Sequence, residues 1–237
     1  MRINRVIGSM FAAVALAASS TAYAADGGTG TVTVIHGISG LPEPVGVYAN
    51  GNFLFSFDFE DVQGPLPLPV GIYNLEVKLG TNVVLSGAAN VEDGKDYTVV
   101  AHFTHTSGDP GIKLSVFENT TTPICDKQLR LTVRHLADAP AVDAVVSRGA
   151  TSTRNFVGTP NLASSEGGNN QGGALDFKAG TYSAQLYVAG TTTSAFDSGK
   201  LKLEGGVSYI AYAIGSLQAD TFTVYIQTID LPTFSCK

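Results

Sequence analysis

Apolar and polar residues alternate along most of this chain, in short runs that turn residues separate. Residues 31–36 alternate valine or isoleucine with threonine, and residues 72–79 place apolar side chains on one face and polar ones on the other. A period of two is typical of a β-strand with one buried face. Asn50-Gly51 lies between two apolar runs and predicts a tight hairpin, because both residues tolerate positive φ. The pattern favours an all-β fold.

The first of these runs occurs twice. Residues 32–36 read Val-Thr-Val-Ile-His, residues 131–135 read Leu-Thr-Val-Arg-His, and a proline-containing loop follows each run. Later landmarks repeat in the same order, namely Val45 with Val142, Gly71-x-Tyr73 with Gly180-x-Tyr182, and Gly94 with Gly206. An ordered set of shared landmarks indicates internal duplication. Together with the spacing of the turns, it predicts two tandem antiparallel β-sandwiches of the immunoglobulin-like kind.

The repeats divide the chain as follows. We expect a first β-sandwich domain over residues 25–118, a linker over residues 119–128 and a second β-sandwich domain over residues 129–237. The second domain contains a Gly/Asn/Ser-rich stretch at residues 149–173, which we expect to form a surface loop. That loop is either a tolerated insertion or a contact loop on a rigid scaffold.

Residues 1–24 have the pattern of a cleaved signal peptide. Arg2 and Arg5 precede an apolar run over residues 6–18, and Ala22-Tyr23-Ala24 fits the rule for a cleavage site. Without these residues the formal charge moves from −6 to −8, because two arginines are removed. We therefore expect an exported protein, in the periplasm, at the cell surface or secreted, with no membrane segment in the mature chain. An acidic chain is a poor candidate for binding nucleic acid or anionic lipid.

The chain has two cysteines, Cys125 just before the second repeat and Cys236 at its end. In an oxidising compartment such a pair usually forms a disulfide. This bond would join the start and the end of the second domain, and the alternative is two unrelated thiols.

The repeated motifs resemble the bacterial family named domain of unknown function 4397, in two tandem copies. That family's pattern is V-x-V-x-H, a proline loop, V-D-V-Y, P-x-G-x-Y and E-x-G-x-x-Y-T-V. The first copy has Val32–His36, Val45–Tyr48, Pro69–Tyr73 and Glu92–Val99, and the second copy is looser. At the Asp position of the family pattern the first copy has Gly46 and the second copy has Asp143, so only Asp143 can have the role of that Asp. The second copy also departs from the pattern at Lys178, where the family has Pro. The resemblance implies exported, often repeated β-sandwich modules of cell envelopes, without an established activity.

The G-x-Y element has a structural interpretation. Tyr73 and Tyr182 can each place the ring in the core while the hydroxyl reaches a backbone group, as in the corners of other sandwiches.

The equivalent histidines His36 and His135 are the first candidates for chemistry. Each follows a strand and precedes a proline loop, where an imidazole can hold the loop by bonding a backbone carbonyl. We favour this structural role over catalysis, because no recognisable nucleophile elbow accompanies either residue. His102 and His105 would lie on opposite faces of a strand, which argues against a shared metal.

Acidic residues and aromatic residues complete the candidates. The turn acids could gather around Ca²⁺, although we favour solvated turns without a bound ion; they are Asp58, Glu60, Asp61, Glu92, Asp93 and Asp96. Without tryptophan, a sugar-stacking surface would need Tyr48, Phe53, Phe55 and Phe57, most of which alternate like core residues.

These observations favour a non-enzymatic exported envelope or secreted module without a cofactor. It would act through contacts with an envelope or extracellular protein or polysaccharide, in adhesion or in surface or matrix assembly. The alternative is a soluble periplasmic protein that binds a small ligand, a glycan or Ca²⁺.

Overall fold

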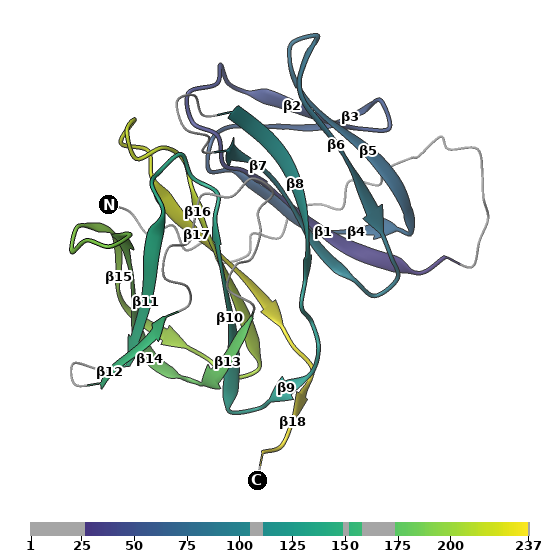
Figure 1. Ribbon diagram of the computed structural model, residues 1–237. Coiled ribbons are helices and arrows are strands. Elements are labelled where there is room, and N and C mark those ends of the chain that lie inside the picture. The colour runs from purple at the N-terminus through teal and green to yellow at the C-terminus, as the bar shows by residue number, and fades with distance from the viewer. Residues whose placement is uncertain (1–26, 105–110, 149–151, 158–173, 237) are drawn as a thin grey trace.

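The computed structural model describes residues 27–104, 111–148, 152–157 and 174–236, and every regular element in these residues is a β-strand (Figure 1). The all-β expectation is confirmed. Within these ranges no helix has the length and apolar character needed to cross a membrane. The expected signal peptide at residues 1–24 lies outside the described residues, and so does His105.

The first sandwich consists of two four-stranded sheets. We call the sheet with strand order β4-β1-β7-β8 inner sheet 1 and the sheet with order β3-β2-β5-β6 outer sheet 1. Their strands are β1 (Thr29–His36), β2 (Val45–Ala49), β3 (Asn52–Phe57), β4 (Val62–Pro69), β5 (Gly71–Leu79), β6 (Asn82–Val91), β7 (Asp96–Thr104) and β8 (Gly111–Asn119).

The second sandwich has the same strand order. Inner sheet 2 is β13-β10-β16-β17 and outer sheet 2 is β12-β11-β14-β15. Its strands are β10 (Gln128–His135), β11 (Val142–Arg148), β12 (Ser152–Val157), β13 (Leu175–Lys178), β14 (Gly180–Val188), β15 (Ser194–Leu203), β16 (Val207–Ile214) and β17 (Thr223–Asp230). Each strand of the first sandwich therefore has a structural equivalent in the second.

Two features of the pairing differ from the sequence expectation. In each inner sheet the first strand runs parallel to its central neighbour, β1 with β7 and β10 with β16, while the other pairs within the sandwiches are antiparallel. The stretch at residues 149–173, expected to be a loop, contains β12, which pairs with β11. Backbone hydrogen bonds to a central strand suffice to form such an edge strand, and the sequence pattern does not reveal them. The rest of that stretch lies outside the described residues.

The two inner sheets pack against each other. Alternate residues of β1, β7 and β8 point away from the core of the first sandwich, and those of β10, β16 and β17 away from the core of the second. Together with Leu136, which directly follows β10, their apolar members form one cluster of Ile35, Val100, Phe117, Ile210, Tyr212 and Ile214, against which Tyr225 and Ile229 of β17 pack. The two sandwiches are thus joined by a buried interface between sheet faces.

A buried hydrogen-bond network lies beside this apolar cluster. It connects Thr31, Thr33, Asp96, Thr98, Asn119, Arg134, Tyr212 and Gln227. Arg134 donates to the Tyr212 hydroxyl at 2.9 Å and to the Asn119 side-chain oxygen at 3.0 Å. Its guanidinium lies 4.1 Å from the centre of the Phe117 ring. Because a buried cation is costly without partners, this network fixes how the two sheets face each other.

The segment between the sandwiches is also held in place. Residues 119–128, expected to be a linker, include Asn119 at the end of β8, the short β9 (Ile124–Cys125) and Gln128 at the start of β10. β9 pairs with β18 (Thr233–Phe234) near the end of the chain. Cys125 and Cys236 form a disulfide next to this pair, with their Cα atoms 5.5 Å apart.

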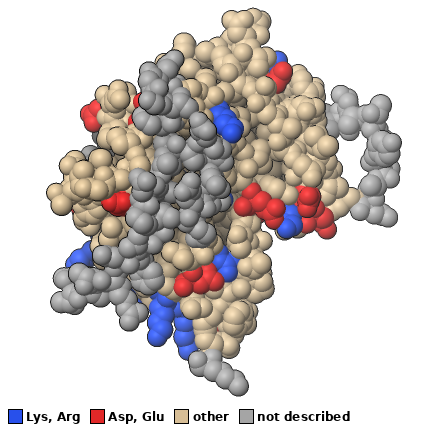
Figure 2. Space-filling view, viewed as in Figure 1, with Lys and Arg blue, Asp and Glu red and all other residues tan. Residues whose placement is uncertain are grey.

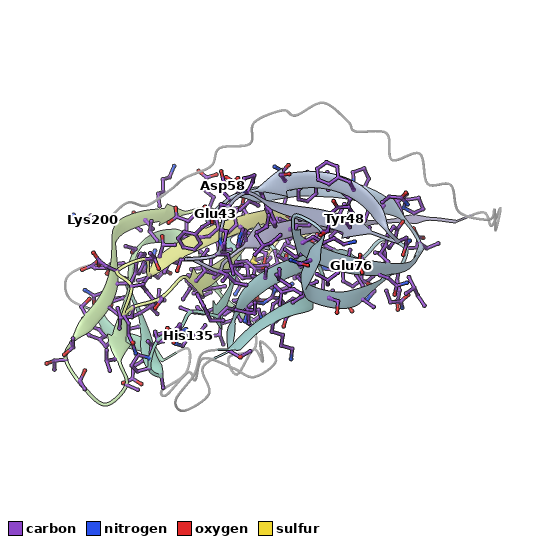
Figure 3. The ribbon with its side chains drawn as sticks, turned by 90° about the horizontal axis from the view of Figure 1, so that it is seen from above. Glu43, Tyr48, Asp58, Glu76, His135 and Lys200 are labelled. Atoms are coloured by element: carbon purple, nitrogen blue, oxygen red, sulfur yellow. A yellow bond between two sulfur atoms is a disulfide. The ribbon has the colours of Figure 1, made fainter. Side chains whose placement is uncertain are left out.

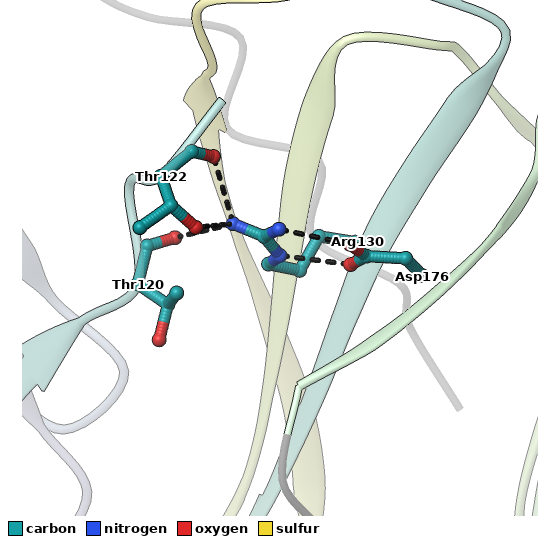
Figure 4. Close-up of polar contacts among 4 residues, drawn as sticks. All are labelled: Thr120, Thr122, Arg130 and Asp176. Carbon is teal, nitrogen blue, oxygen red and sulfur yellow. Dashed lines mark hydrogen bonds and ion pairs between the residues drawn. The ribbon is translucent and has the colours of Figure 1, made fainter. Parts of the chain in front are cut away.

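Arg130 fastens the same segment to the second sandwich (Figure 4). The nearly buried guanidinium makes a bidentate pair of hydrogen bonds to the Asp176 carboxylate, at 2.8 and 2.9 Å. It also donates to the Thr122 carbonyl and hydroxyl, both at 2.9 Å. The connection between the sandwiches is therefore ordered.

Candidate functional site

The outward face of outer sheet 1 carries an aromatic pair, the half-buried Tyr48 and the exposed Phe53. Tyr48 in β2 is paired in register with Phe53 in β3, and the next matched pair is Val47 with Phe55. The irregularity at Leu54 between these pairs turns Phe53 outward, whereas Phe55 packs on the apolar core. As a result, 56% of Phe53 is exposed.

Four side chains form what we call the aromatic patch: Tyr48, Phe53, Glu76 and Lys78. The Tyr48 and Phe53 rings meet edge to face with centroids 5.4 Å apart. Lys78 Nζ lies 4.3 Å from the centre of the Tyr48 ring and 2.8 Å from Glu76 Oε2. The cation is therefore held by both an aromatic ring and a carboxylate, which fixes all four side chains relative to one another.

Gly46 makes room for this arrangement. A Cβ at this position would lie 3.1 Å from Cε2 of Tyr48 and 3.6 Å from Cε2 of Phe53. The Tyr48 ring thus leans over the backbone of Gly46, and a side chain at this position would require the ring to shift by a few tenths of an ångström or more. Gly46, which departs from the motif of the resembled family, therefore leaves space for the Tyr48 ring of the aromatic patch.

The rest of the face consists of uncharged residues, both polar and apolar. Its outward residues beyond the patch include Ser56, Ile72, Asn74, Val83, Ser86, Ala88 and Asn90. Ile72 and Val83 are 67% and 49% exposed. Figure 3 places Tyr48 and Glu76 together on the first sandwich, far from Lys200 of the second.

The equivalent face of the second sandwich has different chemistry. Asp143 stands at the position of Gly46, and its carboxylate accepts the Gly190 N–H at 3.0 Å. Val145 stands at the position of Tyr48. Tyr187, at the position of Lys78, donates its hydroxyl to Gln185 at 2.8 Å. Asp143 therefore holds a turn in this sandwich, and the aromatic patch belongs to the first.

The two G-x-Y tyrosines hold the bends before β5 and β14. The Tyr73 hydroxyl donates to the Pro69 carbonyl at 2.9 Å, and the Tyr182 hydroxyl donates to the Lys178 carbonyl at 2.6 Å. Both rings lie in their sandwich cores, Tyr182 in contact with the ring of Phe177.

His36 is fully buried at the end of β1. Its Nδ1 accepts the Ile38 N–H at 3.3 Å, and its Nε2 lies 3.9 Å from a carboxylate oxygen of Glu43. Burial lowers the pKa of His36 to about 4, although Asp61 and Asp58 act in the opposite direction. The imidazole is therefore neutral near pH 7 and holds the loop that follows β1.

His135 occupies the equivalent position in the second sandwich, where its Nε2 donates to the Pro140 carbonyl at 3.0 Å. Figure 3 shows His135 well apart from Glu43 and Asp58, which lie close together. The structure does not bring the two equivalent histidines into one site.

His102 contacts a serine, but the pair is inaccessible. Its Nδ1 donates to the Phe103 carbonyl at 2.7 Å, so its Nε2 accepts the Ser115 hydroxyl at 2.8 Å. His102 is fully buried and Ser115 is 7% exposed. Burial lowers the pKa of His102 to about 4, against the effect of the Phe103 hydrogen bond. A substrate has no route to this serine without local opening.

Several of the turn acids accept hydrogen bonds from other groups of the protein. Asp61 accepts the Asp58 N–H at 2.9 Å, and Asp96 is buried in the network between the sandwiches. In the described ranges, the group that brings three possible ligand atoms together consists of Cys125, Asp126 and Cys236. Its two sulfurs are joined as a disulfide, so they are not available as thiolate ligands.

Each sandwich encloses an apolar cavity between its sheets, of about 40 Å³ in the first and about 60 Å³ in the second. Tyr73 lines the first cavity and Tyr182 the second. Pockets for drug-sized ligands measure roughly 300–1,000 Å³. These cavities lack the room for such a ligand.

The comparison with protein families identifies one domain, with a match to the family described as a domain of unknown function, DUF4397. A DUF4397 domain is found at residues 30–145. This range runs from β1 into β11, so the DUF4397 match covers the first sandwich with its aromatic patch and the first strands of the second. A second tandem copy is not included in the match. No curated protein matches the chain significantly.

Among solved structures, the chain is similar to the carbohydrate-binding module CBMbc, of family CBM26, from Eubacterium rectale Amy13K in complex with maltoheptaose. The identity is 11%, the match covers 82% of this chain and 96% of that chain, and the TM-score is 0.23. A TM-score this low carries no argument about the site.

Proposed function

We propose that this protein is a non-enzymatic, exported envelope or secreted module that acts through contacts made by the aromatic patch, in adhesion or in surface or matrix assembly. The observation that carries the proposal is the pair of the exposed Phe53 and the half-buried Tyr48 on the outward face of outer sheet 1. Aromatic side chains supply large contact area at a low cost in side-chain entropy, and their exposure in water is unfavourable unless a partner covers them.

The scaffold supports this role. The buried interface between the inner sheets, the disulfide and Arg130 hold the patch on a rigid body, and rigid presentation lowers the entropy lost on binding. The small cavities and the absence of three gathered ligand oxygens among the described residues favour a surface contact over a small ligand or Ca²⁺.

We further propose that the second sandwich is a diverged copy of the DUF4397 domain. Its support is the identical strand order and the equivalent His135, Gly180 and Tyr182. Since Val145 replaces Tyr48 there, the contact role stays with the first sandwich.

The test is the location of the protein in its native host. Cells, periplasm, outer membrane and medium are separated, and intact cells are treated with protease, for the wild type and for the Tyr48→Ala/Phe53→Ala variant. We expect wild-type protein in the surface-bound or matrix fraction and the variant released in soluble form.

The matched control is Phe234→Ala, because Phe234 is also 56% exposed but lies in β18, outside the patch. A wild type confined to the periplasm in soluble form refutes the adhesive function. Equal distribution of the wild type and the double variant refutes the patch as its contact surface.

A further inference from the structure

The charge balance of the outward face of outer sheet 1 distinguishes between classes of polymer. Glu76 and Lys78 are the charged residues among its outward positions, and they neutralise each other at 2.8 Å. The remaining polar groups there are amides and hydroxyls, from Asn74, Asn90 and Ser86. The protein as a whole is acidic. This face therefore has no net positive charge to attract an anionic polymer. The negative charge of the protein around it would repel such a polymer.

Figure 2 shows one face of the whole molecule. Lys, Arg, Asp and Glu side chains stand there in small separate groups on a mostly uncharged surface. Electrostatic steering of a charged polymer requires a larger surface area that carries charges of one sign.

The patch also differs from a typical protein-docking site. Protein interfaces place their aromatic anchors in a centre from which charged residues are depleted. Here Lys78 lies over the Tyr48 ring, with 21% of its side chain exposed, and Glu76 lies next to it with 33% exposed. Covering this pair with an apolar protein surface would remove water from both charges without replacing its hydrogen bonds.

A sugar ring fits both parts of the patch. One face of a pyranose presents C–H groups, which can lie on the exposed Phe53 ring and against Tyr48. The hydroxyls at its edge can donate to Glu76 and accept from Lys78, and both bonds are charge-assisted. The combination of an aromatic surface with a neutralised pair of hydrogen-bonding groups therefore suits a sugar polymer that carries no charge.

We infer that the aromatic patch binds a neutral polysaccharide, with a pyranose ring stacked on Phe53 and packed against Tyr48, and its hydroxyls bonded to Glu76 and Lys78. This inference rests on the proposed function and names the partner class of the same site. It excludes anionic polysaccharides as preferred partners.

The test is affinity electrophoresis of the full mature protein in native gels. Separate gels contain neutral polymers (amylose, mixed-linkage β-glucan, xylan, galactomannan), anionic polymers (alginate, polygalacturonate) or none. We expect at least one neutral polymer to retard the wild type equally at low and high salt. Tyr48→Ala should weaken this retardation about fivefold, because loss of one contact with an aromatic ring costs on the order of 1 kcal/mol. Phe234→Ala should migrate like the wild type, and circular dichroism checks that each variant is folded.

The other outcomes separate the inference from the proposed function. Retardation only by the anionic polymers, lost in Tyr48→Ala/Phe53→Ala, overturns the neutral class and leaves the patch as the contact surface. If no polymer retards the protein and the double variant is still released from the cell surface, the partner is a protein. This result also overturns the neutral class and leaves the patch as the contact surface. Retardation that the double variant retains overturns both.

Discussion

At the scale of single residues, Gly46 and Tyr48 act as a pair. Gly46 gives the Tyr48 ring the space to lean over β2, and the second sandwich has Asp143 and Val145 at the same positions. The sequence identifies Gly46 only as a departure from the resembled motif. Residue 46 is a glycine because the Tyr48 ring lies against it, and this contact depends on the direction of the Tyr48 side chain in the folded sheet.

Substitution of this glycine tests the pair. Gly46→Asp should displace the Tyr48 ring and reduce surface association about as much as Tyr48→Ala does. The melting temperature should change by only a few degrees, because position 46 faces solvent. Surface association is measured by fractionation and stability by calorimetry. Unchanged association would mean that the orientation of Tyr48 is not important for the contact.

Two buried histidines make stability depend on pH. His36 and His102 have a pKa of about 4 in the folded chain against an ordinary value of 6.5. Between these values the unfolded chain binds protons that the folded chain does not, so the free energy of unfolding falls as the pH falls from 6.5 to 4. The loss is about 3 kcal/mol for each histidine.

Urea unfolding at pH 7 and at pH 4.5 measures this loss. The control is His36→Gln/His102→Gln, which lacks both imidazoles and should lose less stability over the same interval. Equal losses in the two proteins would show that carboxylates alone cause the pH dependence.

At the scale of elements, alternation along the chain predicts most strands but not the side chains that leave the regular pattern. Phe53, Phe55 and Phe57 read as one face of a strand, and the irregularity at Leu54 separates Phe53 from the others. The parallel pairing of β1 with β7 joins segments far apart in sequence, which local periodicity does not reveal. The sequence names Tyr48 and Phe53 as residues that could stack on a sugar, but alternation reads most of that aromatic set as core, because it does not reveal this irregularity.

Arg130 stabilises the segment between β8 and β10. Arg130→Met should lower the free energy of unfolding by about 1–3 kcal/mol, because it removes charge-assisted bonds that involve a nearly buried guanidinium. The matched control is Lys202→Met, which removes an ion pair whose side chains are 79% and 66% exposed. That control should cost less than about 1 kcal/mol. Equal values from urea unfolding would contradict the role of Arg130.

The disulfide closes a large loop at the same end of the molecule. Cys125 and Cys236 are 111 positions apart, and in the chain-entropy model a loop of this size contributes ~4–5 kcal/mol. Reductant should therefore lower the midpoint of urea unfolding for the wild type and leave Cys125→Ser/Cys236→Ser unaffected. A wild type that is insensitive to reductant would refute this contribution.

At the scale of the whole molecule, the two inner sheets have complementary faces. Ile35 is structurally equivalent to Arg134, Phe117 to Gln227 and Asn119 to Ile229, so a polar residue on one face stands where the other has an apolar one. From sequence alone, Arg130, Thr132 and Arg134 read as a solvent-facing side of β10. Arg134 is buried because the first sandwich supplies Asn119 and Phe117 as its partners, whereas Arg130 bonds to Asp176 and Thr122, and a single strand indicates neither set of partners.

This interface predicts cooperative unfolding. The wild type should unfold in one calorimetric transition, since separation of the sandwiches would expose the apolar cluster and the buried network. Arg134→Ala removes one hydrogen-bond donor each from the Asn119 side-chain oxygen and the Tyr212 hydroxyl, and should cost about 1–3 kcal/mol. Two resolved transitions in the wild type would contradict a shared cooperative unit.

The most direct measurement of the central claim is hydroxyl-radical footprinting of the wild-type protein on surface or matrix material from its native host. The method reads the exposure of individual Tyr and Phe side chains. We predict that Tyr48 and Phe53 become protected, while Phe234 stays reactive. Protection of Phe234 or Tyr187, with Tyr48 and Phe53 as reactive as in free protein, would contradict the assignment of the aromatic patch as the contact surface.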